Sequence, residues 1–414
     1  MFVDPVLASV TFLKKKRLDF FRIFFYLAVF SFSLWMYAWE FQFAVTDLHV
    51  HAVIASEFNF LDLHSITSRL AYPMWHLFVS ILFQLGVPLQ WASALVCAGV
   101  KVLGMFLVCL LLHVITGGQV KRQAITLSAI FLMFVTGIRI PGFNSMVYRG
   151  VGSPTTWHNP TQLMVFVSML LCIPYVVHCW YEFQRRLPQG KSHAMLPWRK
   201  VFLLAALLMF SLACKPTFMQ AFLPACAVFF LIEWFRHPKN SRYFLQIILA
   251  FLPAALYFLL QYLYYTGVVV PFTSGVAFGA TLETAWFSIR SMLIMAAFPF
   301  YTLVFCYQKG MLKDKMLVIT LLLTLFSMLQ SMFFRETGLR VGHGNFNWAS
   351  MGSALMLWVL TLGHFLLSFS HFFRSHPKPW FRWPLYGIGF ALLAWHVYSS
   401  GFYIWHLLVS GNAF

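Results

Sequence analysis

Long apolar runs alternate with short polar segments along almost the whole chain. A helix needs about 20 apolar residues to cross the hydrocarbon core of a bilayer, and most of the runs are close to that length. We expect membrane-spanning helices near residues 20–45, 91–115, 123–140, 160–182, 200–214, 217–235, 244–269, 290–308, 315–334, 347–371 and 383–408. The pattern therefore predicts an all-α, polytopic bundle of about 11 transmembrane helices.

The run from Trp75 to Val87 is too short to be one of these spans. It has about 13 residues against the 20 that a crossing needs. It also contains His76 and Gln84, and Gly86-Val87-Pro88 ends it. Short helices of this kind are typical of the membrane surface. We predict a juxtamembrane helix that lies along the membrane after the first span.

The composition also indicates a membrane protein, because 61% of the 414 residues are hydrophobic and only 10% are charged. A soluble domain of this composition could not keep its apolar surface out of water. The net charge of +18 would suggest a nucleic-acid partner in a soluble protein. Here most Lys and Arg residues stand in short segments between spans, as the positive-inside rule requires, so we expect no nucleic-acid partner.

The basic clusters predict the orientation of the spans. They lie at residues 14–17, 121–122, 185–200, 236–242, 309–315 and 374–382. All of them fall on one side of the membrane if residues 75–88 do not cross it, and the positive-inside rule makes that side the cytoplasm. The N-terminus is then inside and the C-terminus outside. We expect a multi-pass protein of the bacterial inner membrane whose active site faces the periplasm.

Polar residues are concentrated in the segments that this topology places outside. These segments are 46–90, 139–160, the Lys215-Pro216-Thr217 turn, 270–289 and 335–347. Ionised groups are costly inside a bilayer, so they stay at its rim unless a function needs them. The chain has no phosphate-binding glycine loop, nucleotide fingerprint or nucleophile elbow, which argues against an ATP-driven pump or a hydrolase. We place the candidate chemistry in the outer segments.

The order of these parts resembles the GT-C superfamily of integral-membrane glycosyltransferases. An acidic motif, Asp47-Leu48-His49, follows the first span, and Tyr72-Pro73-Met74-Trp75-His76-Leu77 is similar to the family's Tyr-Pro-Pro-Leu helix at the membrane surface. Members of this family transfer a sugar from a polyprenyl-phosphate donor on the non-cytoplasmic face. The family often has Asp-Asp, Asp-Glu or Glu-x-Asp where this chain has Asp-x-His. The second outer segment has no acid between Arg139 and Pro160.

The resemblance implies that the chain is divided into two parts. Residues 1–235 correspond to a GT-C-like transmembrane module whose first outer loop, 46–90, is catalytic. Residues 236–414 supply C-terminal transmembrane helices that complete the cavity for donor and acceptor. The implied partners are a polyprenyl-phosphate-linked sugar donor, a lipid-linked or cell-envelope glycan acceptor and membrane lipids.

Asp47 is the candidate catalytic base. Sugar transfer with inversion needs one general base to take the proton of the acceptor hydroxyl, and a phosphate leaving group needs no strong acid. The alternative is that Asp47 caps a helix that begins at Leu48, or forms a salt bridge. Glu57 and Asp62, in the same outer loop, are weaker candidates for this role, and Glu57 is also a candidate for contact with the sugar.

Two histidines near Asp47 have more than one interpretation. His49 and His51 share a face if the segment is extended and lie on different faces of a helix. Together with Asp47 they could ligate a divalent cation. The alternative is that they are hydrogen-bonding partners of the sugar or of neighbouring side chains. No metal or other cofactor is predicted firmly.

A lipid phosphate at the membrane rim needs cations outside the cytoplasmic clusters. We expect this role for Lys215, Arg335 and Arg340, with Arg149 and Arg139 behind them. One Arg side chain can bind two oxygens of a phosphate at the same time, whereas Lys supplies a point charge. Lys215 lies between two apolar runs, where its charge is costly unless an anion is near. The alternative is a Lys side chain that extends to lipid headgroups.

Two outer segments carry the other candidate sugar-binding residues. The 335–347 loop contains three glycines, which let a backbone approach a ligand closely, and its candidates are Glu336, His343 and Asn345. Alternatively, Arg335 and Glu336 pair with each other. His158 and Asn159 could bind a sugar by stacking and hydrogen bonding, or cap the span that starts at Pro160.

These observations predict a membrane glycosyltransferase, transferring a hexose or pentose from a lipid-phosphate donor with inversion. Two alternatives use the same outer cations. One is a polysaccharide polymerase that acts on lipid-linked repeat units, and the other is a lipid or glycolipid transporter. Transporters commonly have repeated halves with interrupted spans, and we detect no such internal repeat in this sequence.

Overall fold

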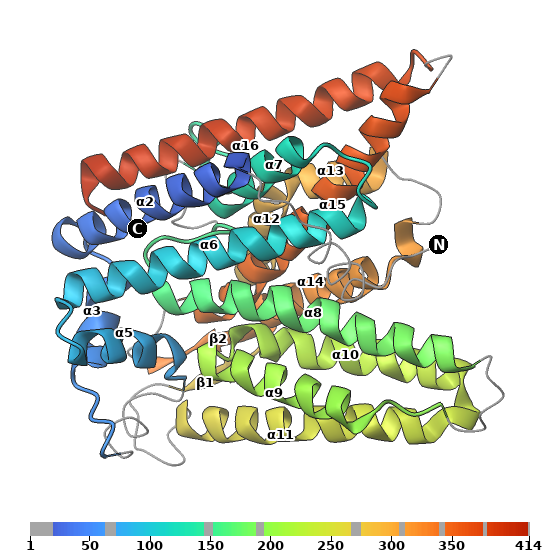
Figure 1. The fold of residues 1–414 in the computed structure, drawn as a ribbon, viewed down its shortest axis with the longest axis horizontal. Coiled ribbons are helices and arrows are strands. Elements are labelled where there is room, and N and C mark those ends of the chain that lie inside the picture. The colour runs from blue at the N-terminus through green and yellow to red at the C-terminus, as the bar shows by residue number, and fades with distance from the viewer. Residues whose placement is uncertain are drawn as a thin grey trace.

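The computed structural model describes residues 20–62, 72–144, 152–187, 194–265, 275–305, 311–338, 344–375 and 379–412. They form a bundle of long helices, most of which run nearly parallel or antiparallel to one another (Figure 1). The helices are α2 (Phe20–Phe43), α3 (Asp47–Ser56), α5 (Met74–Gln84), α6 (Leu89–Ile115), α7 (Arg122–Phe134), α8 (Pro160–Arg186), α9 (Trp198–Cys214), α10 (Thr217–Arg236), α11 (Ser241–Tyr265), α12 (Leu282–Met295), α13 (Ala297–Phe305), α14 (Lys315–Phe333), α15 (Trp348–Arg374) and α16 (Arg382–Ser410), with short 3₁₀ turns η2 (Pro238–Asn240), η3 (Met311–Lys313) and η5 (Asn345–Asn347).

The regular strands in the described residues are β1 (Val276–Phe278) and β2 (Phe334–Glu336), which pair antiparallel. The predicted fold class, an all-α polytopic bundle, is thus confirmed. Seven described helices are long and apolar enough to cross a membrane, in α2, α6, α8, α10, α11, α14 and α15. An eighth is formed if α12 and α13, which are bent by 75° at their junction, count as one span.

Three of the expected spans are not in this group. The helices α7 and α9 have 13 and 17 residues, and α16 is also outside it. The number of eleven spans and the N-inside orientation stay predictions. The short helix after the first span is present as α5, whose 11 residues reach about 16 Å, half of a hydrocarbon core. Its position on a membrane surface also stays a prediction.

The expected span at 123–140 is helical only as far as Phe134. Beyond it the backbone is extended, and α16 supplies partners for the exposed amides. The Thr136 N–H donates to Ser400 Oγ over 3.2 Å, and the Arg139 N–H donates to Ser399 Oγ over 2.8 Å. Backbone that is not helical is tolerated at membrane depth only when its polar groups have partners, and the α16 serines meet that requirement.

The two ends of the bundle differ in charge. At one end, Gln119 accepts from the Arg374 guanidinium through its backbone oxygen (2.9 Å), Lys200 pairs with Glu182 (2.9 Å) and Lys315 pairs with Glu233 (2.9 Å). These contacts gather the turns that carry the basic clusters, so we call it the basic end. The described residues of the basic clusters between residues 121 and 382 therefore lie at the same end of the bundle, as the sequence predicts.

The opposite end is called the α3 end and comprises residues 44–62, 72–88, 214–217, 334–338, 344–347 and 411–412. A backbone bridge between Val45 and Asn412 joins the end of α2 to the end of α16 there. Helices α3 and α5 lie side by side at this end (Figure 1). The described residues of the outer segments 46–90 and 335–347 and of the Lys215 turn thus meet in one region.

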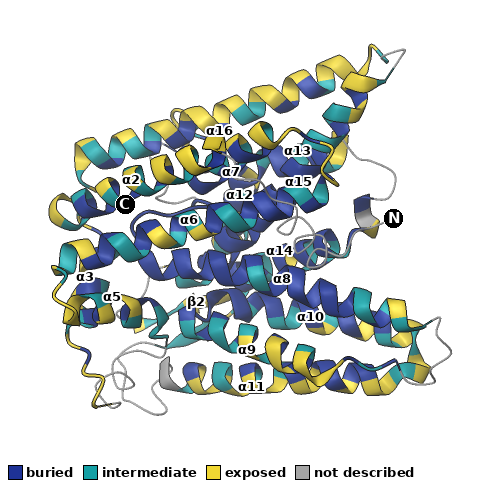
Figure 2. Cartoon of the chain, in the orientation of Figure 1, coloured by how far each residue is buried: buried dark blue, intermediate teal, exposed yellow. Residues whose placement is uncertain are grey.

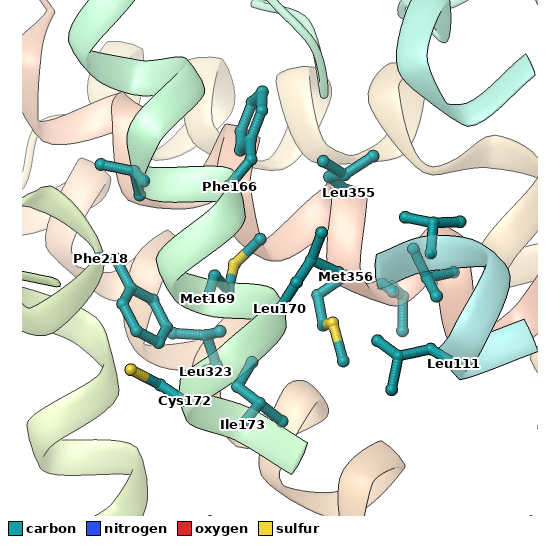
Figure 3. Close-up of a cluster of buried hydrophobic side chains, with 14 of the residues drawn as sticks. Leu111, Phe166, Met169, Leu170, Cys172, Ile173, Phe218, Leu323, Leu355 and Met356 are labelled. Atoms are coloured by element: carbon teal, nitrogen blue, oxygen red, sulfur yellow. The ribbon is translucent and has the colours of Figure 1, made fainter. Parts of the chain in front are cut away.

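The centre of the bundle is formed by α8 and α15. Both are almost entirely buried, whereas α2, α11 and α16 expose one side (Figure 2). In the core, Phe166, Met169 and Leu170 of α8 face Leu355 and Met356 of α15 (Figure 3). In a membrane such packing depends on close van der Waals contact, because lipid tails are as apolar as the side chains. The rigid α8–α15 pair positions the residues at the α3 end.

Candidate functional site

Asp47 is the first residue of α3 and lies half-buried at the α3 end. The cap of α3 is Thr46, whose hydroxyl accepts a hydrogen bond from the Leu48 N–H over 3.3 Å. The Asp47 carboxylate is therefore not needed as the cap. Instead it accepts a hydrogen bond of 2.8 Å from the side-chain amide of Asn159.

Asn159 connects the acid to a cation. Its Oδ1 accepts from the Gln162 N–H over 3.1 Å, which caps α8, and also from the Lys215 ammonium over 3.3 Å. The capping interpretation of Asn159 is thus confirmed, while its contact with a sugar stays a prediction; the residue also lies in a polar cluster. Asp47, Asn159 and Lys215 come from three separate segments, and we call them the Asp47 cluster.

Lys215 is buried in the turn between α9 and α10. Its Nζ lies 4.3 Å from the centre of the Trp348 ring, so it receives a cation–π contact as well as the Asn159 oxygen. Burial lowers the pKa of Lys215 to about 8, while Asp47 and Glu336 oppose that shift. The side chain remains mostly protonated at neutral pH and presents a positive charge with little water around it.

Lys215 also lines a cavity of about 600 Å³ at the α3 end. This volume is within the range of pockets that hold small molecules, about 300–1,000 Å³. The apolar part of the lining is Pro216, Pro224, Phe258, Phe326, Leu329, Phe333, Phe334 and Phe346, among others. The polar lining includes Thr217, Gln220, Gln330, Glu336 and Asn345. We call it the Lys215 cavity.

Asp47 itself is not part of that lining, and it reaches the Lys215 cavity through Asn159. Tyr72, the first residue of the Tyr-Pro motif, is part of it. The cavity thus brings together the first outer loop, the Lys215 turn, the β1–β2 ribbon and the loop before α15. These are segments that the sequence places on the same face.

Glu336 and Asn345 bind each other in the wall of the Lys215 cavity. The Asn345 amide donates to Glu336 Oε1 over 2.6 Å, and Trp348 Nε1 donates to Asn345 Oδ1 over 3.2 Å. This chain of contacts positions the Trp348 ring beside Lys215. The alternative prediction, a pair between Arg335 and Glu336, is not formed among the described contacts.

Arg335 is not part of the lining of the Lys215 cavity, and its expected place in a phosphate clamp stays a prediction. Alternate residues of a strand point to opposite faces. Phe334 and Glu336 line the cavity, whereas Arg335 lies between them on the exposed face of β2. Two other predicted cations, Arg149 and Arg340, and the predicted sugar ligand His343 lie outside the described residues.

Two candidate histidines lie close to Lys215 and are neutral. Burial, and then the charge of Lys215, lower the pKa of His51 and of His158 to about 3. His51 Nδ1 is 2.9 Å from His76 Nε2, so one of the two rings donates to the other. The His158 ring lies 5.7 Å from the Trp348 ring. Both histidines therefore remain hydrogen-bonding groups at neutral pH without adding charge.

His49 and Glu57 are not part of this arrangement. His49 is exposed, on another side of α3, with its ring 4.9 Å from the ring of Phe41. Glu57 is exposed at the far end of α3, about 15 Å from Asp47 along the helix. Their predicted contact with the sugar is not supported by this placement.

The expected ligands of a divalent cation are not assembled. Asp47 and His51 are four positions apart on α3 and share a face, but His49 does not. Within the part of the chain that the structure describes, no three His, Cys, Asp or Glu side chains lie together as a metal site.

The sequence interpretation missed one fully buried acid, Glu40 in α2. Lys101, in α6, is also almost fully buried. The Lys101 ammonium donates to the Met133 carbonyl over 2.6 Å and lies 4.3 Å from the Trp157 ring. A carboxylate inside an apolar run is itself a signal of function, and Glu40 could have been found from it. Trp348, which contacts Lys215, carried no signal in the sequence.

No protein-family model, no characterised protein and no solved structure matches the chain. The functional argument therefore depends on the geometry of the Asp47 cluster and the Lys215 cavity.

Proposed function

We propose that the chain is a membrane glycosyltransferase of the GT-C type. It moves a sugar from a polyprenyl-phosphate donor to a lipid-linked glycan or cell-envelope acceptor, with inversion. The observation that carries the proposal is the Lys215 cavity, where a buried ammonium stands in a largely aromatic and aliphatic lining. A ligand that suits this cavity has an anionic group for Lys215 and an apolar chain for the phenylalanines.

A polyprenyl phosphate has both features. Its phosphate would bind at Lys215, where low solvent exposure strengthens a charge-assisted hydrogen bond. Its isoprenoid chain would lie against Phe258, Phe326 and Phe333, which are cavity-lining residues of α11 and α14. Lys215 would also stabilise the negative charge that develops on the phosphate as it leaves.

The Asp47 cluster supplies the base. One oxygen of Asp47 is bound to the Asn159 amide, which orients the carboxylate. The free lone pairs would take the proton of the acceptor hydroxyl while its oxygen attacks the anomeric carbon and the bond to the phosphate breaks. His51 and His158 are neutral, and so they suit hydrogen bonding to sugar hydroxyls rather than phosphate neutralisation.

The finer topology belongs to the same proposal. Eleven spans would place the two termini on opposite sides of the membrane. With the basic end in the cytoplasm, the α3 end would be on the periplasmic side of a bacterial inner membrane. Polymerisation of lipid-linked repeat units would use the same donor geometry with a longer acceptor. A transporter would need the Lys215 cavity but not the Asp47 base, which separates it from the transferase.

The decisive experiment measures donor binding and transfer in the same protein. We expect the purified protein in detergent to bind a polyprenyl phosphate at least tenfold more tightly than the uncharged polyprenol. The difference should disappear in Lys215→Met, because a charge-assisted contact contributes about 1.5–3 kcal/mol. Arg185→Gln is the matched control, since Arg185 pairs with Glu182 at the basic end. Equal binding of both lipids by the wild-type protein contradicts the proposal.

A further inference from the structure

Arg139 lies against α16, on the flank of the bundle away from the Lys215 cavity. The carbon of its guanidinium is 3.8 Å from the centre of the Phe402 ring, and Nη1 donates to the Tyr398 hydroxyl over 3.4 Å. Its backbone is fixed by Ser399 and by the Trp395 indole N–H, which donates to the Arg139 carbonyl over 2.9 Å. In Figure 1, α16 and α11, which lines the Lys215 cavity, are at opposite edges of the molecule.

The charge of Arg139 has no carboxylate beside it in the described part of the chain. The ion pairs found there involve Glu182, Glu233 and Asp314, all near the basic end. The Nε atom of Arg139 is buried and has no hydrogen-bond partner among the described residues. A guanidinium has five N–H donors; in Arg139 one is used by Tyr398 and the Nε–H is buried, which leaves three on the two Nη atoms without a partner among the described residues.

A second arginine borders the same segment from the other side. The Ile138 N–H donates to the Ile294 carbonyl of α12 over 3.2 Å, so residues 138–144 lie between α12 and α16. Arg290, one turn earlier in α12, has its guanidinium carbon 5.7 Å from the ring of Phe143. The surface formed by residues 138–144, α12 and α16 therefore carries positive charge and exposed aromatic rings.

The position of Arg139 along α16 bears on its depth in a bilayer. Phe402 and Tyr398 are eight and twelve residues before the end of α16 at Ser410, which is about 12–18 Å along the helix. The 29 residues of α16 extend about 43 Å and exceed a hydrocarbon core of about 30 Å by about 13 Å. When this excess projects at the Ser410 end, Phe402 lies at the edge of the core and Tyr398 about 5 Å inside it. A long Arg side chain reaches the remaining distance to the headgroups. The exposed rings of Trp395, Tyr398 and Trp405 suit the same interface.

We propose that Arg139, supported by Arg290, binds the phosphate of a membrane-embedded lipid between α12 and α16. The planar guanidinium stacks on Phe402 and keeps its outer N–H groups for two phosphate oxygens, while the lipid tail lies along the exposed apolar surface. The site is separate from the Lys215 cavity and does not depend on the transferase proposal.

Native mass spectrometry of the protein released from detergent micelles tests this site. The probes are phosphatidylglycerol, phosphatidylcholine of the same chains, and geranylgeranyl phosphate. We expect the wild-type protein to retain an anionic lipid that Arg139→Gln binds at least tenfold more weakly. The more Arg139-dependent of the two anionic probes identifies the source of the phosphate, a phospholipid or a lipid-linked intermediate. Arg185→Gln, with the same loss of charge at the basic end, should bind as the wild type does.

Two further measurements keep the test independent of folding and of the Lys215 cavity. Lys215→Met should leave the Arg139-dependent lipid in place, so a failure of the transferase proposal does not affect this result. In the unaltered protein, a photoreactive phosphatidylglycerol should label peptides containing residues 138–144 or 395–402. Labelling confined to other peptides, or a lower melting temperature of Arg139→Gln with unchanged lipid retention, would overturn the proposal and make Arg139 purely structural.

Discussion

The carboxylate of Asp47 is bound by the side-chain amide of Asn159, 112 positions later in the chain, over 2.8 Å. The same Asn159 side chain accepts from Lys215 over 3.3 Å. One amide thus keeps the acid and the cation apart at a fixed distance instead of letting them form a direct ion pair. Lys215 remains available to an anion, and the proposed general-base transfer from a phosphate donor uses such a separated acid and cation.

Asp47→Asn should fold normally and lose transfer. Thr46, not Asp47, caps α3, so the substitution leaves the cap in place. General-base help contributes about 10²–10⁴ in rate, and the variant should lose at least that much. Glu57→Gln is the control, because Glu57 is exposed at the other end of α3 and should keep full activity. Near-normal turnover of Asp47→Asn, in assays of purified protein, contradicts the assignment of the base.

Asn159 has two roles that substitution can separate. Ser is as good a helix cap as Asn, but its side chain is too short to reach both Asp47 and Lys215. Asn159→Ser should therefore retain the melting temperature and lose transfer, whereas Asn159→Ala should lose the cap as well, at a cost of about 0.5–2 kcal/mol in stability. Full activity of Asn159→Ser would mean that the bridge between Asp47 and Lys215 is only structural.

Binding of a polyprenyl phosphate should weaken at alkaline pH. The pKa of Lys215 is lowered to about 8, first by burial, so the ammonium loses its proton as the pH rises through that value. The phosphate is already fully ionised above about pH 7 and does not offset the loss. We expect affinity to fall by about tenfold between pH 7 and pH 9.5. The affinity of Lys215→Arg for polyprenyl phosphate should be independent of pH in this range, because a guanidinium stays charged. An equal decrease in the affinity of that variant would assign the pH dependence to another group.

The sequence was sufficient for the fold class and for the convergence of three segments at the α3 end. Apolar runs of span length predict the long helices, and the loops that carry Asp47, Asn159 and Lys215 do converge. Individual partners were not predictable in the same way. The face that Arg335 takes depends on the register of the β1–β2 ribbon, which a three-residue strand does not encode. Trp348 contacts Lys215 only through the packing of α15 against α8, and the break of α7 after Phe134 depends on serines of α16.

The neutral histidines predict a loss of stability in acid. His51 and His158 have a pKa of about 3 in the folded protein and about 6.5 when unfolded. Below pH 6.5 the unfolded chain takes up protons that the folded chain refuses, so the free energy of unfolding falls until the pH reaches about 3. The melting temperature in detergent should decrease between pH 7 and pH 4.5. His51→Gln should reduce that decrease, whereas His49→Gln, at an exposed position, should not change it.

The topology can be tested with one cysteine at each end of the bundle. Gln119 is exposed in the turn between α6 and α7, at the basic end, and Ser56 lies at the end of α3. If α5 does not cross the membrane, the α6–α7 turn is cytoplasmic and the α3 end is outside. A membrane-impermeant thiol reagent added to intact cells should then label Ser56→Cys but not Gln119→Cys, and both should react after the cells are opened. The described native cysteines are buried and provide a low background. Labelling of Gln119→Cys from outside would mean that α5 crosses or that the orientation is reversed, and the proposed periplasmic position of the Asp47 cluster would then be wrong.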